Sequence, residues 1–148
     1  TEVARLKEVN AVANAPKRIG SGKITIDSGA SESVLPKEML NEIRLEESPG
    51  SKAGVQYVTA NGSRMPNMGQ RKVFFNTKDG CENNIMFQVT NARKPLASVS
   101  AIVTKGNRVV FDVDEAYIQN KASGKKVHLV KESGTYHLPV EYVFPRPN

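Results

Sequence analysis

The sequence is poor in the residues that build disulfides and metal sites. It has one cysteine, Cys81, two histidines and no tryptophan among 148 residues. A single thiol cannot form an internal disulfide, and one thiol with two imidazoles supplies too few soft ligands for a structural zinc ion. We therefore expect no metal and no cofactor. We also expect an intracellular, cytoplasmic protein, because free thiols persist in a reducing compartment.

Long apolar runs are also missing. No stretch approaches the roughly 20 apolar residues that cross a bilayer, so we expect no membrane partner. No charged segment followed by an apolar one comes after Thr1, and the sequence shows no secretory signal. We interpret the chain as a segment excised from a longer protein.

Positive charge exceeds negative charge in this chain. Lys and Arg number 21, Asp and Glu number 15, and the formal net charge is +6. Such an excess favours contact with polyanions, because Lys and Arg release counterions from phosphate backbones. The basic residues are interleaved with acidic ones rather than gathered in one run, which favours an ordinary solvated surface. A weak contact with nucleic acid is the most that the charge predicts.

The hydrophobic pattern predicts one β-rich domain. Hydrophobic residues make up 39% of the chain, which is enough for a buried core. Helix-like apolar spacing predicts an arm or short helix over residues 1–18, and short β-branched runs separated by turn residues follow it. We expect an all-β, mainly antiparallel fold with one or two short helices. A core over residues 19–106 would precede a β-rich extension, residues 107–148, packed on the same domain.

The first strand leads into an acidic turn. Lys23-Ile24-Thr25-Ile26 is β-branched and runs directly into Asp27-Ser28-Gly29-Ala30. After Val34-Leu35-Pro36, residues 37–43 predict a helical turn, and Ser48-Pro49-Gly50 predicts a polar loop. A strand that ends on an aspartate beside small residues places a carboxylate where a backbone can approach closely.

A hairpin is predicted in the middle of the chain. Strand-like runs at residues 55–59 and 65–75 flank Ala60-Asn61-Gly62-Ser63, and Asn-Gly between such runs is typical of a hairpin. A type I′ turn there requires positive φ at Gly62 and at Asn61.

The second half predicts further strands around one helix. Residues 84–89 form a strand, and a short helix follows Leu96-Ala97-Ser98, with Ser98 as its N-cap and Gly106 as its end. A β-meander then uses residues 108–111, 116–118, 126–130 and 135–138.

Asp27 is the candidate catalytic residue, although Asp-Ser-Gly alone is weak evidence. In most turns of this composition the aspartate only accepts a hydrogen bond from its own backbone. However, Ile24 to Ser31 with Val34-Leu35-Pro36 resembles the active-site segment of retropepsins, in which an apolar strand enters Asp-Thr/Ser-Gly-Ala. The hairpin and the later strand and helix occur in the order that this family shows.

The resemblance is nearest to the retropepsin-like proteins of copia-type retrotransposons and covers about residues 19–138. The segments of this chain that resemble those proteins include Leu96-Ala97-Ser98-Val99-Ser100, Val109-Val110-Phe111-Asp112 and Gly134-Thr135-Tyr136-His137-Leu138. Retropepsins usually have two bulky apolar residues and then Gly before the late helix, whereas this chain has Leu96-Ala97-Ser98. The resemblance implies a closed-barrel acid protease fold with a C-terminal β-meander extension.

The resemblance also implies an aspartic endopeptidase with Asp27 as its catalytic residue. Ser28 would brace the site across a dimer axis, Gly29 would line the substrate backbone, and Ala30 would support them. The substrate-covering flap would be formed by Tyr57, Val58, Thr59, Ala60, Asn61, Gly62 and Ser63. Because the chain has one Asp-Ser-Gly and no internal repeat, the second carboxylate would come from another copy in a homodimer.

The implied substrate is an extended polypeptide of the chain's own retroelement polyprotein, processed in the cytoplasm or within a virus-like particle. The alternative is a catalytically inactive binding or assembly module of the same shape, which contacts nucleic acid or protein. Another alternative makes the β-rich tail a separate interaction module. Tyr57 has two interpretations, pointing into the cleft or packing in the core, and the second is the commoner for an aromatic residue in a hairpin.

Other polar residues are interpreted as ordinary structure. Asp112 and Asp114-Glu115 fall in a turn between strands, and His128 and His137 lie on strands without an acid or cysteine at metal or triad spacing. Ser31 and Ser33 have no neighbouring histidine and are poor nucleophiles. Cys81 follows Asp79-Gly80 in a turn and is interpreted as a bystander.

Overall fold

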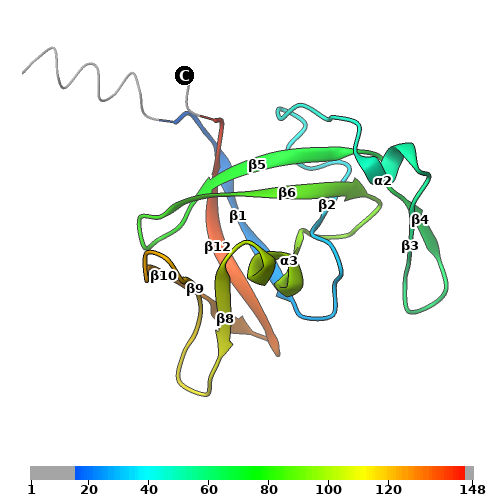
Figure 1. Ribbon diagram of the computed structural model, residues 1–148. Coiled ribbons are helices and arrows are strands. Elements are labelled where there is room, and N and C mark those ends of the chain that lie inside the picture. Colours follow the sequence, from blue (N-terminus) through cyan, green and yellow to red (C-terminus); the bar gives the residue numbers. More distant parts are fainter. Residues whose placement is uncertain (1–15, 146–148) are drawn as a thin grey trace, which may run out of the picture.

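The computed structural model describes residues 16–145, so most of the expected N-terminal arm lies outside the described residues. The described chain is mainly β-structure with two short helices, which confirms the all-β class (Figure 1). The helices are α2 (Pro49–Lys52) and α3 (Val99–Thr104). The strands are β1 (Arg18–Asp27), β2 (Val34–Pro36), β3 (Gln56–Val58), β4 (Arg64–Pro66), β5 (Gln70–Asn76), β6 (Glu82–Thr90), β7 (Leu96–Ser98), β8 (Asn107–Phe111), β9 (Ala116–Asn120), β10 (Lys126–His128), β11 (Val130–Glu132) and β12 (Thr135–Val143).

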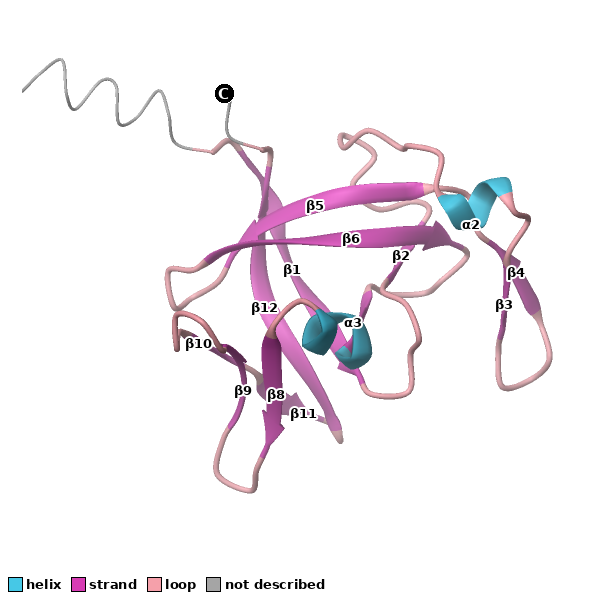
Figure 2. Cartoon of the chain, viewed as in Figure 1, coloured by secondary structure: helices cyan, strands magenta, loops and turns pink. Residues whose placement is uncertain are grey.

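Seven strands form the main sheet in the order β1-β7-β2-β6-β5-β12-β11. Figure 2 shows β5 beside β6 and β1 beside β12. β12 also pairs with β1, so six of these strands follow one another in a closed ring of pairings. Most neighbours are antiparallel, as predicted, while β1 with β7 and β2 with β6 run parallel. β7 therefore lies between β1 and β2, and the segment after Asp27 crosses over it.

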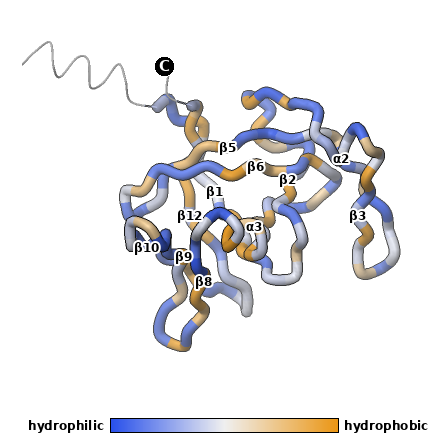
Figure 3. Tube along the Cα trace, in the orientation of Figure 1, coloured by the Kyte–Doolittle hydropathy of each residue, from blue (hydrophilic) through white to orange (hydrophobic). Residues whose placement is uncertain are grey.

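Alternation along the strands decides which side chains enter the core. Ile24 is 0% exposed and Ile26 is 6% exposed, while the residues between and beside them remain accessible. Phe75 and Phe87 on β5 and β6 are also buried in the same cluster. Figure 3 shows apolar segments alternating with polar ones along the chain. Burial of each such side chain stabilises the fold by roughly 1.5–3 kcal/mol, and it anchors the end of β1 that carries Asp27.

The C-terminal strands do not form one continuous meander. β8, β9 and β10 make a separate three-stranded sheet, while β12 lies between β1 and β5 in the main sheet. The single strand expected over residues 126–130 is wrong, because the chain passes at the buried Leu129 from β10, which pairs with β9, to β11, which pairs with β12. The core holds Ile24 and Leu35 together with Leu138 and Val140, so it includes residues from both sides of Gly106.

Two local expectations in the first half also differ from the structure. Residues 37–43 form two successive turns, with Met39 N–H donating to Pro36 O and Ile43 N–H donating to Leu40 O. Leu40 has φ of 55° and a buried side chain, so the predicted helical turn is wrong. The expected loop at Ser48 instead opens α2, because Ser48 and Ser51 satisfy each other's backbone N–H groups in a capping box.

The N-cap of α3 is confirmed. Ser98 Oγ accepts a hydrogen bond of 3.1 Å from Ala101 N–H, and Gly106, two residues after the helix, has φ of 90°. The three residues before the helix form β7 and pair with β1. The helix therefore begins where the strand beside Asp27 ends.

Tyr142 generates a prediction about stability at high pH. Its ring packs against Gly22, where an added Cβ would lie 2.7 Å from Tyr142 Cε2. Its hydroxyl is buried, has no hydrogen-bond partner among residues 16–145, and burial raises the pKa of Tyr142 to about 12. Because the folded pKa exceeds the unfolded value near 10, burial opposes ionisation of this hydroxyl, so its effect on stability is constant below pH 10 and the fold loses stability as pH rises from 10 to 12.

We therefore expect the free energy of unfolding of the protein to fall by up to about 3 kcal/mol between pH 10 and pH 12 through this group, and Tyr142→Phe to lack that part of the fall. Urea unfolding at several pH values measures both. Tyr117→Phe is the matched control, because the Tyr117 hydroxyl makes no hydrogen bond within the described chain. An equal alkaline loss in Tyr142→Phe and Tyr117→Phe would contradict the assignment.

Candidate functional site

Asp27 ends β1 with a partly exposed carboxylate. Its Oδ1 accepts a 2.8 Å hydrogen bond from Gly29 N–H, and no other hydrogen bond or ion pair to this carboxylate occurs within residues 16–145. The bond orients the carboxylate and leaves its second oxygen without a partner in the described part of the chain. An ordinary aspartate turn makes the same bond, so this contact alone does not distinguish a catalytic residue from a structural one.

Ser98 holds the segment that follows Asp27. Asp27 and Ser98 are register partners across the parallel pairing of β1 with β7. The fully buried Ser98 donates from Oγ to Ala30 O at 2.8 Å, and its backbone N–H donates to Ser33 Oγ at 3.0 Å. The middle of the loop, at Ala30, and its end, at Ser33, are thereby fixed to β7. The sequence identified Ser98 only as a helix cap and excluded Ser33 only as a nucleophile, because nothing local indicates that they meet.

The two residues after Asp27 are exposed. Ser28 and Gly29 lie on the surface, and Ala30 is half-buried. A Cβ at Gly29 would lie 3.4 Å from Asp27 Oδ1, within ordinary van der Waals contact of the carboxylate. The structure thus leaves the Ser28 hydroxyl and the Gly29 backbone open to a partner.

The predicted hairpin is confirmed, but its turn is not type I′. β3 and β4 pair with Tyr57 opposite Met65, and the hairpin projects from the rest of the molecule (Figure 1). Gly62 has φ of 84°, whereas Asn61 is not among the residues with positive φ. The loop is longer than two residues, and Asn61 closes it with its side chain, whose Oδ1 accepts from Ser63 N–H at 3.0 Å. Val58, Thr59 and Ala60 complete the predicted set on this hairpin.

Tyr57 ties the hairpin to the loop after Asp27. Its hydroxyl donates a short hydrogen bond to Glu32 Oε2 and accepts one of 3.1 Å from Asn67 Nδ2. The buried Asn67 also donates to Gln88 Oε1 at 2.9 Å and accepts from Ser48 Oγ at 3.1 Å. Burial and then the Glu32 carboxylate raise the pKa of Tyr57 well above its usual range. Tyr57 is half-buried. Its side chain belongs neither to the buried core cluster nor to the lining of a described hollow.

Two hollows lie on opposite faces of β1. One, of about 260 Å³, is mainly apolar and is lined by Ile26 together with residues of β6, α3 and β9. The other, of about 350 Å³, is polar and is lined by Lys23 and Thr25. Because side chains alternate along a strand, Asp27 shares its face with Thr25 and not with Ile26. Asp27 lines neither hollow, but it lies on the same face of β1 as the polar one, while Ser31, Glu32 and Ser33 of the loop after it line the apolar one.

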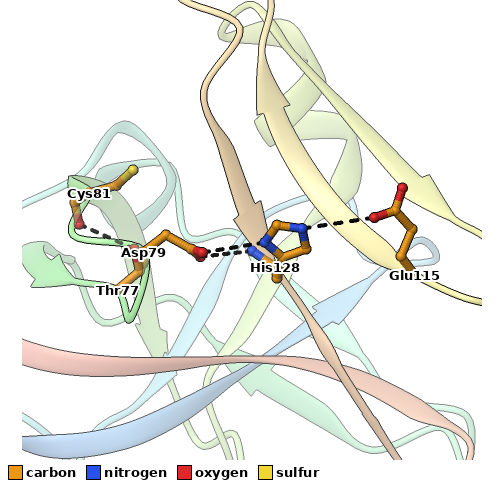
Figure 4. A network of polar contacts seen from close by, with 5 residues as sticks. All are labelled: Thr77, Asp79, Cys81, Glu115 and His128. Atoms are coloured by element: carbon orange, nitrogen blue, oxygen red, sulfur yellow. Dashed lines mark hydrogen bonds and ion pairs between the residues drawn. The ribbon is translucent and has the colours of Figure 1, made fainter.

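His128 lies in a polar network that the sequence did not reveal (Figure 4). Its backbone N–H donates to Asp79 Oδ2 at 3.0 Å, its Nδ1 lies 3.3 Å from Asp79 Oδ1, and its Nε2 lies 3.9 Å from Glu115 Oε2. The backbone hydrogen bond is the main cause that lowers the pKa of Asp79. Cys81 takes part through its carbonyl oxygen, which accepts from Thr77. The network joins the β5–β6 turn to the three-stranded sheet.

Within residues 16–145 no group of three or more His, Cys, Asp or Glu side chains is placed to hold a metal ion. Neither helix in this part of the chain has the length and apolar character to span a membrane. A scan against protein-family models, a search of curated proteins and a search of solved structures each found no match to this chain.

The contact of Tyr57 with Glu32 predicts how the hairpin responds to mutation. We expect Tyr57→Phe to increase the rate of amide hydrogen exchange in residues 56–66 by about tenfold, because a hydrogen bond to a charged group contributes roughly 1.5 kcal/mol. Hydrogen exchange followed by mass spectrometry measures this. Tyr117→Phe is the control and should leave the hairpin unchanged. Equal exchange in the two variants would mean that Tyr57 does not hold the hairpin.

Proposed function

We propose that this chain is a retropepsin-like aspartic endopeptidase that is active as a homodimer, with one Asp27 from each copy. The observation that carries the proposal is the Asp27 carboxylate at the end of β1, oriented by Gly29 N–H and otherwise open. Ser98 fixes the loop that carries it, and Tyr57 connects that loop to a projecting hairpin.

The arrangement of strands supports an acid protease fold. The chain leaves β1, passes Asp27, crosses β7 and enters β2, so that β7 lies between the two strands that flank the loop. The closed ring of pairings through β12 supports the barrel that the resemblance implies. Buried Ala97 and Ser98 lie beneath the loop where the family usually has a bulky residue and Gly, and Ser98 supplies hydrogen bonds in place of apolar packing.

The chemistry follows from the repulsion between two carboxylates. At about 3 Å separation both cannot be ionised cheaply, so the pair shares one proton. The ionised carboxylate deprotonates a water held between the two, and the protonated one donates to the oxygen of the scissile carbonyl. No covalent intermediate with the enzyme is required.

A second copy is needed because each chain supplies one such carboxylate. A two-fold axis beside Asp27 brings its symmetry mate to the same place and makes Ser28 of each copy face the other. The partial exposure of Asp27 and the full exposure of Ser28 and Gly29 are compatible with that contact.

The substrate we propose is an extended segment of the chain's own polyprotein. An extended peptide would add a strand against the hairpin formed by β3 and β4, and closure of the hairpin would exclude bulk solvent while the one reacting water stays between the carboxylates. The hairpin residues from Tyr57 to Ser63 would form this cover. Processing would take place in the cytoplasm or within a virus-like particle.

Removal of the ionisable oxygen tests the catalytic role. We expect Asp27→Asn to lower peptide cleavage by more than about 1,000-fold while the chain remains folded, because the amide keeps the shape but cannot share a proton. Mass spectrometry of a peptide library incubated with each protein measures cleavage. Asp114→Asn is the control, since Asp114 is an exposed turn aspartate. Normal turnover by Asp27→Asn would show that Asp27 is not the catalytic residue, whereas no cleavage by the unmodified protein would favour an inactive binding module.

Dependence on concentration tests the shared site. Because half of the catalytic pair leaves when the dimer dissociates, we expect specific activity to fall on dilution below the dissociation constant of the dimer. Light scattering at each concentration reports the oligomeric state. Activity that stays proportional to protein concentration in a verified monomer would contradict the two-chain site.

A further inference from the structure

We infer that the polar hollow beside Asp27 is a substrate pocket that accepts an acidic side chain, an inference that rests on the proposed peptidase function. Strand geometry places the pocket there. Side chains two apart on β1 lie about 7 Å apart on one face, so Thr25 lies next to Asp27 and Lys23 lies beyond it. A peptide whose scissile bond is at Asp27 would direct the side chain of a nearby residue into this hollow of about 350 Å³.

The walls of the hollow come from both neighbours of β1. On one side Thr25 is opposite His137 of β12, and His137 is buried. On the other side Thr25 N–H donates to Pro95 O at 3.1 Å, which brings the exposed Lys94 to the rim. The pocket is therefore formed by strands that are far apart in the sequence but adjacent in the sheet.

The charge of the hollow favours an anion. Its lining includes two ammonium groups, of Lys23 and Lys94, and one carboxylate, of Glu132, which leaves a net charge of +1 when His137 is neutral. Glu132 is already engaged, with Lys23 Nζ at 3.0 Å and His137 Nε2 at 3.5 Å, and the hydrogen bond from Lys23 lowers the pKa of Glu132. Lys94 makes no ion pair or side-chain hydrogen bond with any residue in the described range. Lys94 is thus the ammonium group that remains for a ligand.

The rim of the pocket is held by a tight turn. β11 and β12 are joined by Ser133 and Gly134, with φ of 51° and 80°, so both central residues of the two-residue loop are left-handed, as a type I′ turn requires. Thr135 Oγ1 donates to Glu132 O at 3.0 Å and closes the turn. Ser133 also lines the hollow, and its hydroxyl can donate to a carboxylate beside the Lys94 ammonium, whereas the single hydroxyl proton of Thr135 is taken by Glu132 O.

Removal of the Lys94 charge tests the pocket by its effect on cleavage preference. In library cleavage, we expect Lys94→Gln to reduce the preference for Glu over Gln at one position near the cut by about threefold to fivefold, because an ammonium and carboxylate pair at the exposed rim is lost. Lys121→Gln removes the same charge from an exposed turn and should keep the preference. A preference that is absent in the unmodified protein, or unchanged in Lys94→Gln, overturns the inference and leaves the peptidase proposal standing.

A binding measurement separates this inference from the peptidase function. Two labelled octapeptide mixtures are randomised except at one position, which is Glu in one mixture and Gln in the other. Asp27→Asn protein is added to each mixture at pH 7, and fluorescence anisotropy measures binding. The measurement is repeated with the fixed residue at each position of the peptide. We expect tighter binding of the Glu mixture at one position, and loss of that difference in Asp27→Asn with Lys94→Gln but not with Lys121→Gln. Equal binding of the Glu and Gln mixtures at every position overturns the pocket, whether or not the chain cleaves peptides.

Discussion

The arrangement around Asp27 depends on the hydrogen bonds of the buried Ser98 hydroxyl. It donates to Ala30 O and accepts from Ala101 N–H, so one side chain both fastens the loop and begins α3. Its backbone N–H meets Ser33 Oγ in the same buried place. Unsatisfied buried polar groups each cost about 1–3 kcal/mol, so the loop, β7 and the helix are ordered together rather than independently.

The alternation of β1 divides the molecule into two environments. Ile24 and Ile26 face the apolar core and the cavity behind the loop, while Lys23, Thr25 and Asp27 face the polar side. β12 continues this division, because Leu138 and Val140 enter the core and His137 faces the polar hollow. The same two-residue period that stabilises the fold therefore keeps candidate chemistry away from the apolar interior.

The features that could be predicted from the sequence are those with short-range causes. β-branched alternation indicated β1 and β6, Asn61-Gly62 indicated the hairpin, and the Ser98 cap followed from its place before an apolar run. Prediction was wrong where a side chain's burial overrode local preference. Leu40 takes a left-handed conformation in the turns at residues 37–43, and its side chain is buried in the core.

The sequence by itself determined the all-β class, the strand that ends at Asp27 and the hairpin, because turn chemistry and side-chain period act within a few residues. Only the tertiary structure decided which polar groups meet. Tyr57 reaches Glu32 across 25 positions, and His128 reaches Asp79 across 49. The tertiary structure also decided that β12 lies beside β1, which places His137 opposite Thr25, two residues before Asp27. Such contacts depend on strand order in the sheet, which leaves no periodic signal along the chain.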